Sequence, residues 1–343
     1  AVETVTYYLH RLMAVGKTSK FPGYQYLGIF ASIALSRLEC LLGDHAGCLI
    51  AADSMMATTV GDDTASEIIQ SVVGARLSHA YHISVAYMMT RRYQMAITTL
   101  GAACTYLQRG FKTGQLATRK SQGDSTNTAQ YSKLYDRMIA LLAILTHICP
   151  PRNQLDESLL RSIRDKHGSQ LAKMDDAAAP TTTTPATGTT GNTTPPPPPR
   201  NVYQDLFCFA SPKFISPTLG GNDVYKLQVR QFQSQMAAQQ ESRKLRSYMK
   251  LYTSIELSKL AAFYDDSNPQ AFTSLLLSYK HTMLQEEEDG EKKSALDIHY
   301  HLQGDMVNVD EAEKQRRFEN YFMAQIRQNE EIAKTVAQIS TAV

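Results

Sequence analysis

Three groups of residues in this sequence have types and spacings that could do chemistry. The first is Gly16-Lys17-Thr18, which matches the end of a phosphate-binding loop of the form GxxxxGK[ST]. In such a loop the first glycine would stand at position 11, where this chain has Arg11. The preceding residues TYYLHRLM have a helical pattern, whereas a phosphate loop follows a strand. We therefore expect no phosphate site here.

The other two groups are histidines that could bind a metal or transfer protons. His79 and His82 are three residues apart on an expected helix, but no Asp or Glu stands near them in that helix to complete a site. His299 and His301, with His281 before them, fall on an expected strand, and its alternation turns both away from the apolar face. Ordinary helix histidines and solvated strand histidines are the favoured interpretations.

No nucleophile in the sequence has a plausible base and an orienting partner, so we expect neither an enzyme nor a cofactor. The five cysteines are scattered, lie mostly among apolar residues and form no CxxC pair, which disfavours a zinc site. Such cysteines are typical of reduced thiols in a cytoplasmic protein. They are Cys40, Cys48, Cys104, Cys149 and Cys208.

The bulk properties predict a globular chain with two or three domains. It has 343 residues, of which 43% are apolar, and its net charge of +2 gives no overall attraction to nucleic acid or to an anionic membrane. No apolar run approaches the roughly 20 residues that span a bilayer, so we expect no membrane partner. Because the sequence begins without Met and within a helical pattern, we also expect that a native N-terminal part precedes it.

The region before residue 177 predicts a mainly α fold. Apolar residues recur there at helical spacing, and the clearest pair of segments meets at Arg91-Arg92, with small alanines where two helices could approach closely. The pattern predicts stacked helical hairpins, similar to tetratricopeptide repeats, over residues 1–176. The expected helices are 24–42, 45–59, 65–90, 92–109, 130–148 and 156–175.

A compositional break separates this helical-repeat region from the rest of the chain. Residues 177–200 are rich in Thr and Pro and predict a linker or insertion, in which Asn192-Thr193-Thr194 is interpreted as a chance match to a glycosylation motif. Residues 201–246 predict a helical connector. It comprises a short helix, an extended crossing and a long helix from about Asp223, with one apolar face made of Tyr225, Val229, Phe232 and Met236.

Residues 247–312 have the order of a winged helix, with two short helices followed by a hairpin. Thr253-Ser254-Ile255-Glu256 is interpreted as a capping box that opens the first helix, and Pro269 opens the second. The hairpin turns at Gln303-Gly304-Asp305. Its apolar residues alternate on two strands as Leu296, Ile298 and Tyr300 on one, and Val307 and Val309 on the other.

The charges of this region argue against DNA reading. The second helix of a winged helix can enter a major groove, but residues 269–284 contain one Lys and no Arg, and the acidic run 286–289 follows. Binding that depends on neutralised phosphates would lack cations there. We favour a wing that binds protein or has a structural role.

The strongest local positive charge lies within residues 225–260. Seven Lys and Arg stand there against two Glu, which leaves a net charge of +5. The densest part is Arg243, Lys244, Arg246 and Lys250, which we take as a candidate RNA contact. A solvated helix face with favourable charges near its C-terminus is the favoured interpretation.

Residues 313–343 predict a C-terminal helix that joins a bundle with other subunits. Apolar residues recur in it at roughly heptad steps, interrupted by Gln325 and Asn329. Docking of this helix on its own domain is the alternative. The expected seam consists of Phe318, Phe322, Ile332, Val336 and Ile339.

The order of helical hairpins, winged helix and final helix resembles the PCI domain shared by subunits of the proteasome lid, the signalosome and translation initiation factors. Six stretches between about Tyr24 and Asp310 are similar, more specifically, to the family of L subunits of eukaryotic translation initiation factor three. They are LECLLGDHAGCLIAADSM, VAYMMTRRYQMAI, MIALLAILTHICP, LDESLLRSIRDKHG, LFCFASPKFISP and RSYMKLYTSIELSKLAAF.

This resemblance implies a non-catalytic scaffold subunit of initiation factor three in the cytoplasm. Its implied partners are the other subunits, especially PCI-type sisters, and the small (40S) ribosomal subunit in the 43S preinitiation complex, with ribosomal RNA or mRNA as a further candidate contact. A PCI subunit of the proteasome lid or the signalosome is the alternative. The order of the six stretches favours the first interpretation, and the Thr/Pro tract departs from the family pattern.

Overall fold

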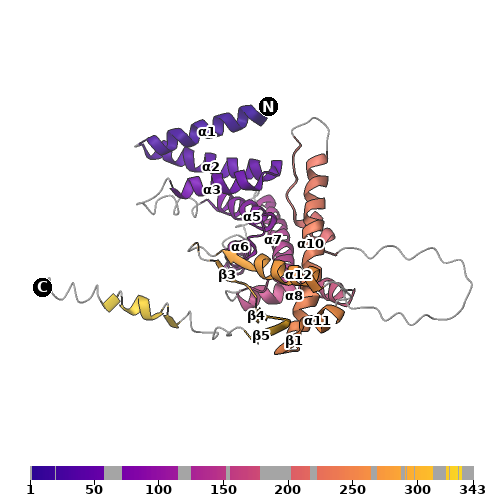
Figure 1. Ribbon diagram of the computed structural model, residues 1–343. Helices are drawn as coiled ribbons and strands as arrows, with labels where there is room; N and C mark the ends of the chain where they lie inside the picture. Colours follow the sequence, from indigo (N-terminus) through magenta and orange to yellow (C-terminus); the bar gives the residue numbers. More distant parts are fainter. Residues whose placement is uncertain are drawn as a thin grey trace, which may run out of the picture.

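The chain folds into a stack of helices, a long helix and a small sheet-containing region (Figure 1). Within the residues that it describes, the structure, a computed structural model, is mainly α, which confirms the predicted fold class, and its strands all follow residue 253. The described residues are 2–19, 21–57, 72–114, 125–151, 155–177, 202–216, 222–263, 269–286, 290, 292–296, 298–311, 322–323, 325–330 and 332–333.

The predicted stack of helical hairpins forms the first half of the chain. Neighbouring helices pack on one another along the sequence, and α2 also packs on α5, so that each hairpin covers the next. The helices are α1 (Val2–Thr18), α2 (Pro22–Leu42), α3 (His45–Ala57), α5 (Val73–Met89), α6 (Tyr93–Lys112), α7 (Ser125–Ile148) and α8 (Glu157–Ala177).

Two tight turns between these helices follow from local chemistry. Gly43 ends α2 with φ +84°, a conformation that glycine adopts without a steric penalty, and its N–H donates to the carbonyl oxygen of Cys40 at 3.1 Å. Arg91, with φ +65°, makes the turn between α5 and α6. Both turns lie where the sequence predicts a helix to end.

Helix α2 is, among the described helices, the one that is long and apolar enough to cross a membrane by length and composition alone, which was not expected from the sequence. In the structure it is a central helix of the stack. Ile29, Leu35 and Cys40 are buried in it, and the buried Ser32 hydroxyl donates to the carbonyl oxygen of Ala51 at 2.5 Å. Packing against α1, α3 and α5 accounts for its apolar composition.

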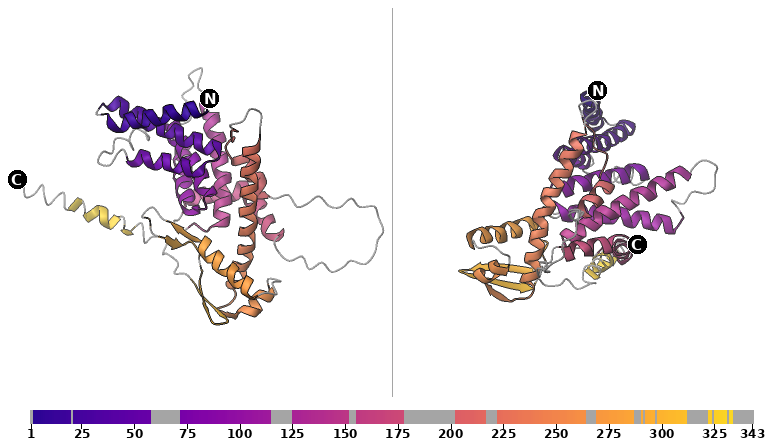
Figure 2. Two further views of the ribbon diagram at one scale, coloured as in Figure 1. Left: turned by 45° about the horizontal axis from the view of Figure 1, so that its top comes forward. Right: turned by 90° about the vertical axis from the view of Figure 1, so that its right-hand side faces the viewer.

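Helix α10 (Asp223–Met249) runs along the stack and into the winged helix (Figure 2). Phe232 stacks on Phe207 of α9 (Val202–Ala210), with ring centroids 4.1 Å apart, and Gln228 lies 2.8 Å from the ring of His45 on α3. The Gln235 amide donates to the carbonyl oxygen of Met89 at the end of α5. The predicted long helix and its buried face are therefore confirmed.

The winged helix is confirmed in its order and its sheet. Its elements are β1 (Ser254–Glu256), α11 (Leu257–Phe263), α12 (Pro269–Thr282), β4 (Ile298–Gln303) and β5 (Met306–Glu311). The three strands pair antiparallel in the order β1-β5-β4, and Val307 faces both Ile255 and Leu302. Gly304 makes the predicted turn with φ +61°.

Two local predictions in this region are wrong. Residues 254–256 form strand β1 rather than a capping box, because pairing with β5 fixes the backbone in an extended conformation, and α11 begins at Leu257. Leu296 is buried, but it precedes strand β4 instead of lying on it. A short hairpin of β2 (Leu284–Glu286) and β3 (Lys292–Ser294) was not expected, and in it Glu286 is paired with Lys292.

The stack and the winged helix share one hydrophobic core, which extends from Cys40 to Val309. At their junction the backbone N–H of Gln94 on α6 donates to the side-chain oxygen of Gln285 on β2 at 3.4 Å, and Arg92 lies 3.7 Å from Glu286. The predicted boundary between residues 246 and 247 falls inside the continuous helix α10. The division into domains stays a prediction.

Candidate protein and RNA interfaces

The glycine of the phosphate-loop match serves helix packing. Gly16, Lys17 and Thr18 lie in the last turn of α1, and Gly16 is buried against Gly28 of α2. A Cβ atom added to Gly16 would lie 2.6 Å from the Cα atom of Gly28. The absence of a side chain at this position lets the two helices touch.

The paired histidines of α5 point into the stack. Burial lowers the pKa of both His79 and His82 to about 4, so both rings are neutral at pH 7. The carbonyl oxygen of His82 accepts from the thiols of Cys40 and Cys48, at 3.5 and 4.0 Å. In the part of the chain that the structure describes, no three His, Cys, Asp or Glu side chains come together as a metal site.

The other candidate reactive groups differ in their exposure to solvent. His299 and His301 are exposed, as predicted, and His301 lies 3.8 Å from Asp310. Burial raises the pKa of Cys104 and of Cys149 to about 12, which keeps both thiols protonated and unreactive at pH 7. All five cysteines are free thiols, and Cys208 alone among them is exposed.

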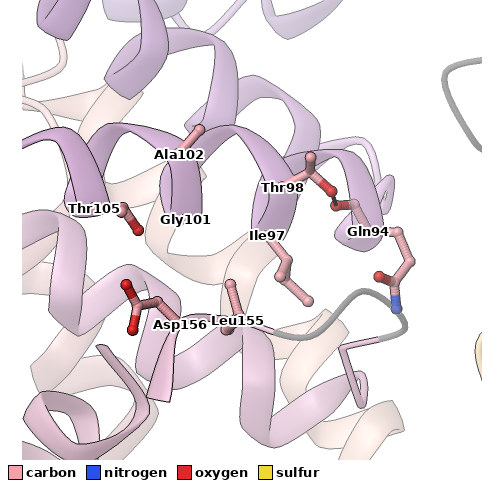
Figure 3. A pocket seen from close by; sticks show the side chains of 8 residues that line it. All are labelled: Gln94, Ile97, Thr98, Gly101, Ala102, Thr105, Leu155 and Asp156. Carbon is pink, nitrogen blue, oxygen red and sulfur yellow. Dashed lines mark hydrogen bonds between the residues drawn. The ribbon is translucent and has the colours of Figure 1, made fainter. Parts of the chain in front are cut away.

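A shallow groove of about 190 Å³ lies between α6 and the start of α8 (Figure 3). Its one ionisable side chain is Asp156, whose carboxylate accepts hydrogen bonds from the N–H and the hydroxyl of Ser158, both at 3.1 Å. These bonds cap the start of α8. The groove is lined by Gln94, Ile97, Thr98, Gly101, Ala102, Thr105, Leu155 and Asp156.

Helix α12, which would be the reading helix of a DNA-binding wing, has its single lysine turned toward the sheet. Lys280 donates to the carbonyl oxygen of Tyr300 at 2.9 Å. The hydroxyl of Tyr300 in turn donates to the carbonyl oxygen of Leu276 at 2.6 Å. These contacts use the lysine to fix α12 on the sheet.

The four basic residues of the candidate RNA contact occupy the last turns of α10. Arg243 and Lys244 lie in the helix, but their side chains are outside the described residues. Arg246 is half-buried and lies near Cys149. Its charge lowers the pKa of that thiol, but burial raises it by more. Lys250 is exposed at the end of the helix. An RNA contact through these residues stays a prediction.

Sequence reasoning missed a set of aromatic rings beside these cations. Tyr248 lies in the last turn of α10 and Tyr252 three residues beyond its end, and both stack on Phe263 at the end of α11. The four-residue spacing of the two tyrosines brought them to attention only as neighbours in the sequence. The position of Phe263, eleven residues further along and beyond strand β1, could not be read from that spacing.

The described part of the expected C-terminal helix is exposed and lies apart from the winged helix (Figure 1). Phe322 is 60% and Ile332 is 54% exposed, and two apolar neighbours that were not predicted, Met323 and Ile326, are 49% and 51% exposed. Phe318, Val336 and Ile339 lie outside the described residues. The seam between subunits stays a prediction.

Comparison with known proteins shows the family. A family described as RNA polymerase I-associated factor PAF67 (Paf67) matches residues 8–329. The chain belongs to the Paf67 family. The match covers the helical stack from residue 8 onward, α10, the winged helix and the C-terminal segment up to residue 329.

Curated relatives of this Paf67 family chain are named eukaryotic translation initiation factor 3 subunit L. The protein of Nematostella vectensis is 28% identical over 337 residues, which cover 94% of this chain and 57% of the relative. The proteins of Danio rerio and Homo sapiens are each 27% identical over 340 residues, which cover 94% of this chain and 53% and 54% of the relatives. The predicted resemblance to the L-subunit family is confirmed. The chain spans about half the length of these relatives.

Proposed function

We propose that this chain is a non-catalytic scaffold subunit of eukaryotic translation initiation factor three in the cytoplasm, and that it supports assembly of the initiation complex on the small (40S) ribosomal subunit. The observation that carries this proposal is the similarity to relatives named as subunit L, which extends over 94% of the chain. The winged helix and the helical stack also fit the architecture that the resemblance implies.

The side chains support a role without chemistry. Candidate reactive groups are either buried and neutral, as His82 and Cys104 are, or exposed on the sheet, as His301 is beside Asp310. The groove at Asp156 has a carboxylate that is already committed to Ser158. A catalytic site requires a reacting group together with the group that activates it. The candidate groups among the described residues do not form such a pair.

The exposed apolar residues support a role in assembly. The C-terminal helix presents Phe322, Ile326 and Ile332 to solvent, and an amphipathic helix of this kind is stabilised when its apolar face packs on partner helices. Strand β4 lies at one edge of the three-stranded sheet, where a strand from a sister subunit of the PCI type could be added. We propose these two features as the contacts with other subunits.

Affinity purification of the tagged chain from its native cytosol, with mass spectrometry and a sucrose gradient, tests the proposal. We expect other subunits of initiation factor three to co-purify and to sediment with 40S particles. Recovery of the proteasome lid or of the signalosome would keep the fold and overturn the function. Recovery of RNA polymerase I, which the description of the Paf67 family names, would overturn it as well.

The candidate RNA contact has its own test. Charge reversal of Arg243, Lys244, Arg246 and Lys250 should weaken association with 40S subunits and reduce its dependence on salt, because each cation that contacts a phosphate releases counterions on binding. Unchanged association across a salt series would refute this contact.

A further inference from the structure

Three aromatic side chains form a partly exposed stack where the long helix α10 meets the winged helix. We call Tyr248, Tyr252 and Phe263 the aromatic corner. The ring of Phe263 lies 5.9 Å from that of Tyr248 and 6.3 Å from that of Tyr252, and the ring planes are inclined by 21° and 12°. The three rings are thus close to parallel, in an arrangement that further planar groups could extend.

Two of the three rings of the aromatic corner are open to solvent, whereas Tyr248 is half-buried against the core. Phe263 is 49% and Tyr252 is 39% exposed, and the neighbouring Leu251 is 73% exposed. Side chains of this size are usually covered in a folded domain, so their grouping at one place indicates a binding surface. The elements that hold them are fixed by buried neighbours, since Met249 of α10 and Leu260 of α11 have no exposed surface.

Cations flank these rings. Lys259 and Phe263 are one turn of α11 apart and therefore lie on the same helix face. Lys250 lies between Tyr248 and Tyr252 in the sequence. Both lysines are exposed, and Lys259 lies 3.5 Å from Glu256. Residues 243–266 contain five Lys and Arg against one Glu and two Asp, a net charge of +2. Exposed rings and exposed lysines therefore occur in the same short part of the chain.

We propose that the aromatic corner binds single-stranded RNA, with unpaired bases stacked on its rings and phosphates held by Lys250 and Lys259. Aromatic platforms beside cations are the usual means of binding unpaired nucleic acid, whereas the bases of a duplex are already stacked and cannot reach the rings. This inference rests on the proposed function in that RNA must be within reach of the subunit. It adds the rings, and Lys259, to the basic residues of α10.

A protein partner is the other occupant to consider, and the charge argues against it. An apolar docking surface for protein is usually depleted of lysine at its centre, whereas here the exposed Lys259 shares a helix face with Phe263. The two occupants also differ in what they require of the rings. A protein contact needs apolar surface, which leucine supplies, but base stacking needs a planar ring.

The first experiment measures binding of the full chain to fluorescently labelled oligo(U) and oligo(A) RNA of about 12 nucleotides by fluorescence anisotropy. Tyr252→Leu and Phe263→Leu each keep apolar volume and remove the ring. We expect each to weaken RNA binding by about fivefold or more, since stacking of one base on an aromatic ring has that value at its lower limit. The matched control is Phe209→Leu on α9, a phenylalanine with 53% exposure, which should leave binding unchanged.

The second experiment tests the lysines by comparing two variants that each lose two positive charges. Lys250→Gln with Lys259→Gln should weaken binding and lower the slope of log affinity against log salt by about 1.4, or roughly 0.7 for each phosphate of a single strand that is no longer neutralised. Lys226→Gln with Arg230→Gln removes two exposed cations from the opposite end of α10 and should leave the slope unchanged. Circular dichroism of every variant verifies that it is folded.

Several outcomes would overturn the inference. They are failure of the unsubstituted chain to bind these RNAs, binding that survives both leucine substitutions, and equal weakening in the Phe209→Leu control. Loss of a co-purifying protein in the leucine variants with RNA binding intact would make the corner a protein site. If the unsubstituted chain co-purifies with initiation-factor subunits but does not bind RNA, this inference alone is refuted. If the chain binds RNA but does not co-purify with those subunits, the proposed function alone is refuted.

Discussion

Burial determines what the side chains of reactive type do in this molecule. His79, His82, Cys40 and Cys48 would all attract attention in a search for chemistry, yet they lie together between α2, α3 and α5 and help to pack these helices. The thiols donate to the carbonyl oxygen of His82, and the Nδ1 atom of His82 lies 2.6 Å from the carbonyl oxygen of Ser78. These atoms of His82, Cys40 and Cys48 are satisfied by the helix backbone, whereas the buried Nδ1 atom of His79 has no hydrogen-bond partner among the described residues.

The buried histidines make the stability of the protein depend on pH. Their pKa of about 4 in the folded chain lies below the ordinary value of about 6.5 that applies to the unfolded chain. Between these two values the unfolded chain binds more protons, so stability falls as the pH drops from 6.5 toward 4. For His82 we expect a decrease in the free energy of unfolding of about 2 kcal/mol between pH 7.5 and pH 5. Urea titrations across this range measure it.

Substitution identifies the group responsible. His82→Gln keeps a polar side chain of similar length that does not titrate, so its free energy of unfolding should vary less between pH 7.5 and pH 5 than that of the unsubstituted chain. The comparison uses the change with pH and not the absolute stability, which any substitution in the core can alter. An equally steep change in His82→Gln and in the His79→Gln, His82→Gln double variant would contradict this assignment.

At the scale of elements, the helices could be predicted from the sequence because their signals are local. Apolar residues at helical spacing, the arginine turn and Gly43 lie within the segments that they shape, so most observed helices agree with the expected ones to within about five residues, although α5 begins at Val73 and not at residue 65 and α1 was not among the expected helices. Strand β1 could not be predicted in this way. Its extended conformation depends on β5, about fifty residues later, and the local pattern of residues 253–256 indicated a helix start instead.

The candidate surfaces could also be predicted only where their residues belong to a single element. The basic residues of α10 and the apolar stripe of the C-terminal helix were visible as runs and repeats within one element. The aromatic corner was not, since it requires Phe263 of α11 to return to the end of α10 after strand β1. Sequence spacing reports which residues share a helix face, but not which two elements will meet.

The hairpin of α1 and α2 depends on the close contact between Gly16 and Gly28. A Cβ atom on Gly28 would lie 2.8 Å from the Cα atom of Gly16, so Gly28→Ala should force the two helices apart. We expect a destabilisation of about 1–3 kcal/mol, as for other overpacked contacts, and faster amide hydrogen exchange confined largely to α1. Hydrogen exchange read out by mass spectrometry measures both the size and the place of the effect.

Gly23 supplies the matched control within the same helix. A Cβ atom there meets no other atom within 4 Å, and alanine is the better helix former by about 1 kcal/mol, so Gly23→Ala should preserve or raise stability. The opposite signs of the two glycine substitutions in α2 separate the helix contact from helix propensity. Equal protection of α1 in both variants would show that the glycine contact does not hold the hairpin.

For the molecule as a whole, α10 joins parts that are far apart in the sequence. It contacts α3 through Gln228, α5 through Gln235 and α9 through Phe232, and its last turn leads directly into the winged helix. Together with the shared hydrophobic core, this connection makes the stack and the wing one packed unit. The last buried apolar residue among those described is Val309, so the C-terminal helix lies outside that unit.

This separation predicts that the C-terminal helix serves assembly and not folding. Deletion of residues 313–343 should leave the thermal unfolding temperature of the chain within about 1–2 °C of its original value, since the deletion removes no buried side chain of the described core. The same deletion should release the chain from the subunits that co-purify with it. Differential scanning calorimetry and affinity purification measure these two effects separately.

Substitutions within the helix test whether partners recognise its apolar seam or only require that the helix is present. Replacing Phe322 and Ile332 by serine removes exposed apolar surface that a partner helix would bury, and should release the partners as the deletion does. The control changes two exposed residues at other positions of the heptad: Met323→Ser and Arg327→Ser. Because these positions point away from the seam, the control variant should stay in the complex. Release by both sets, or by neither, would mean that partners recognise this helix in another way, and a lowered unfolding temperature after the deletion would mean that it packs on its own domain.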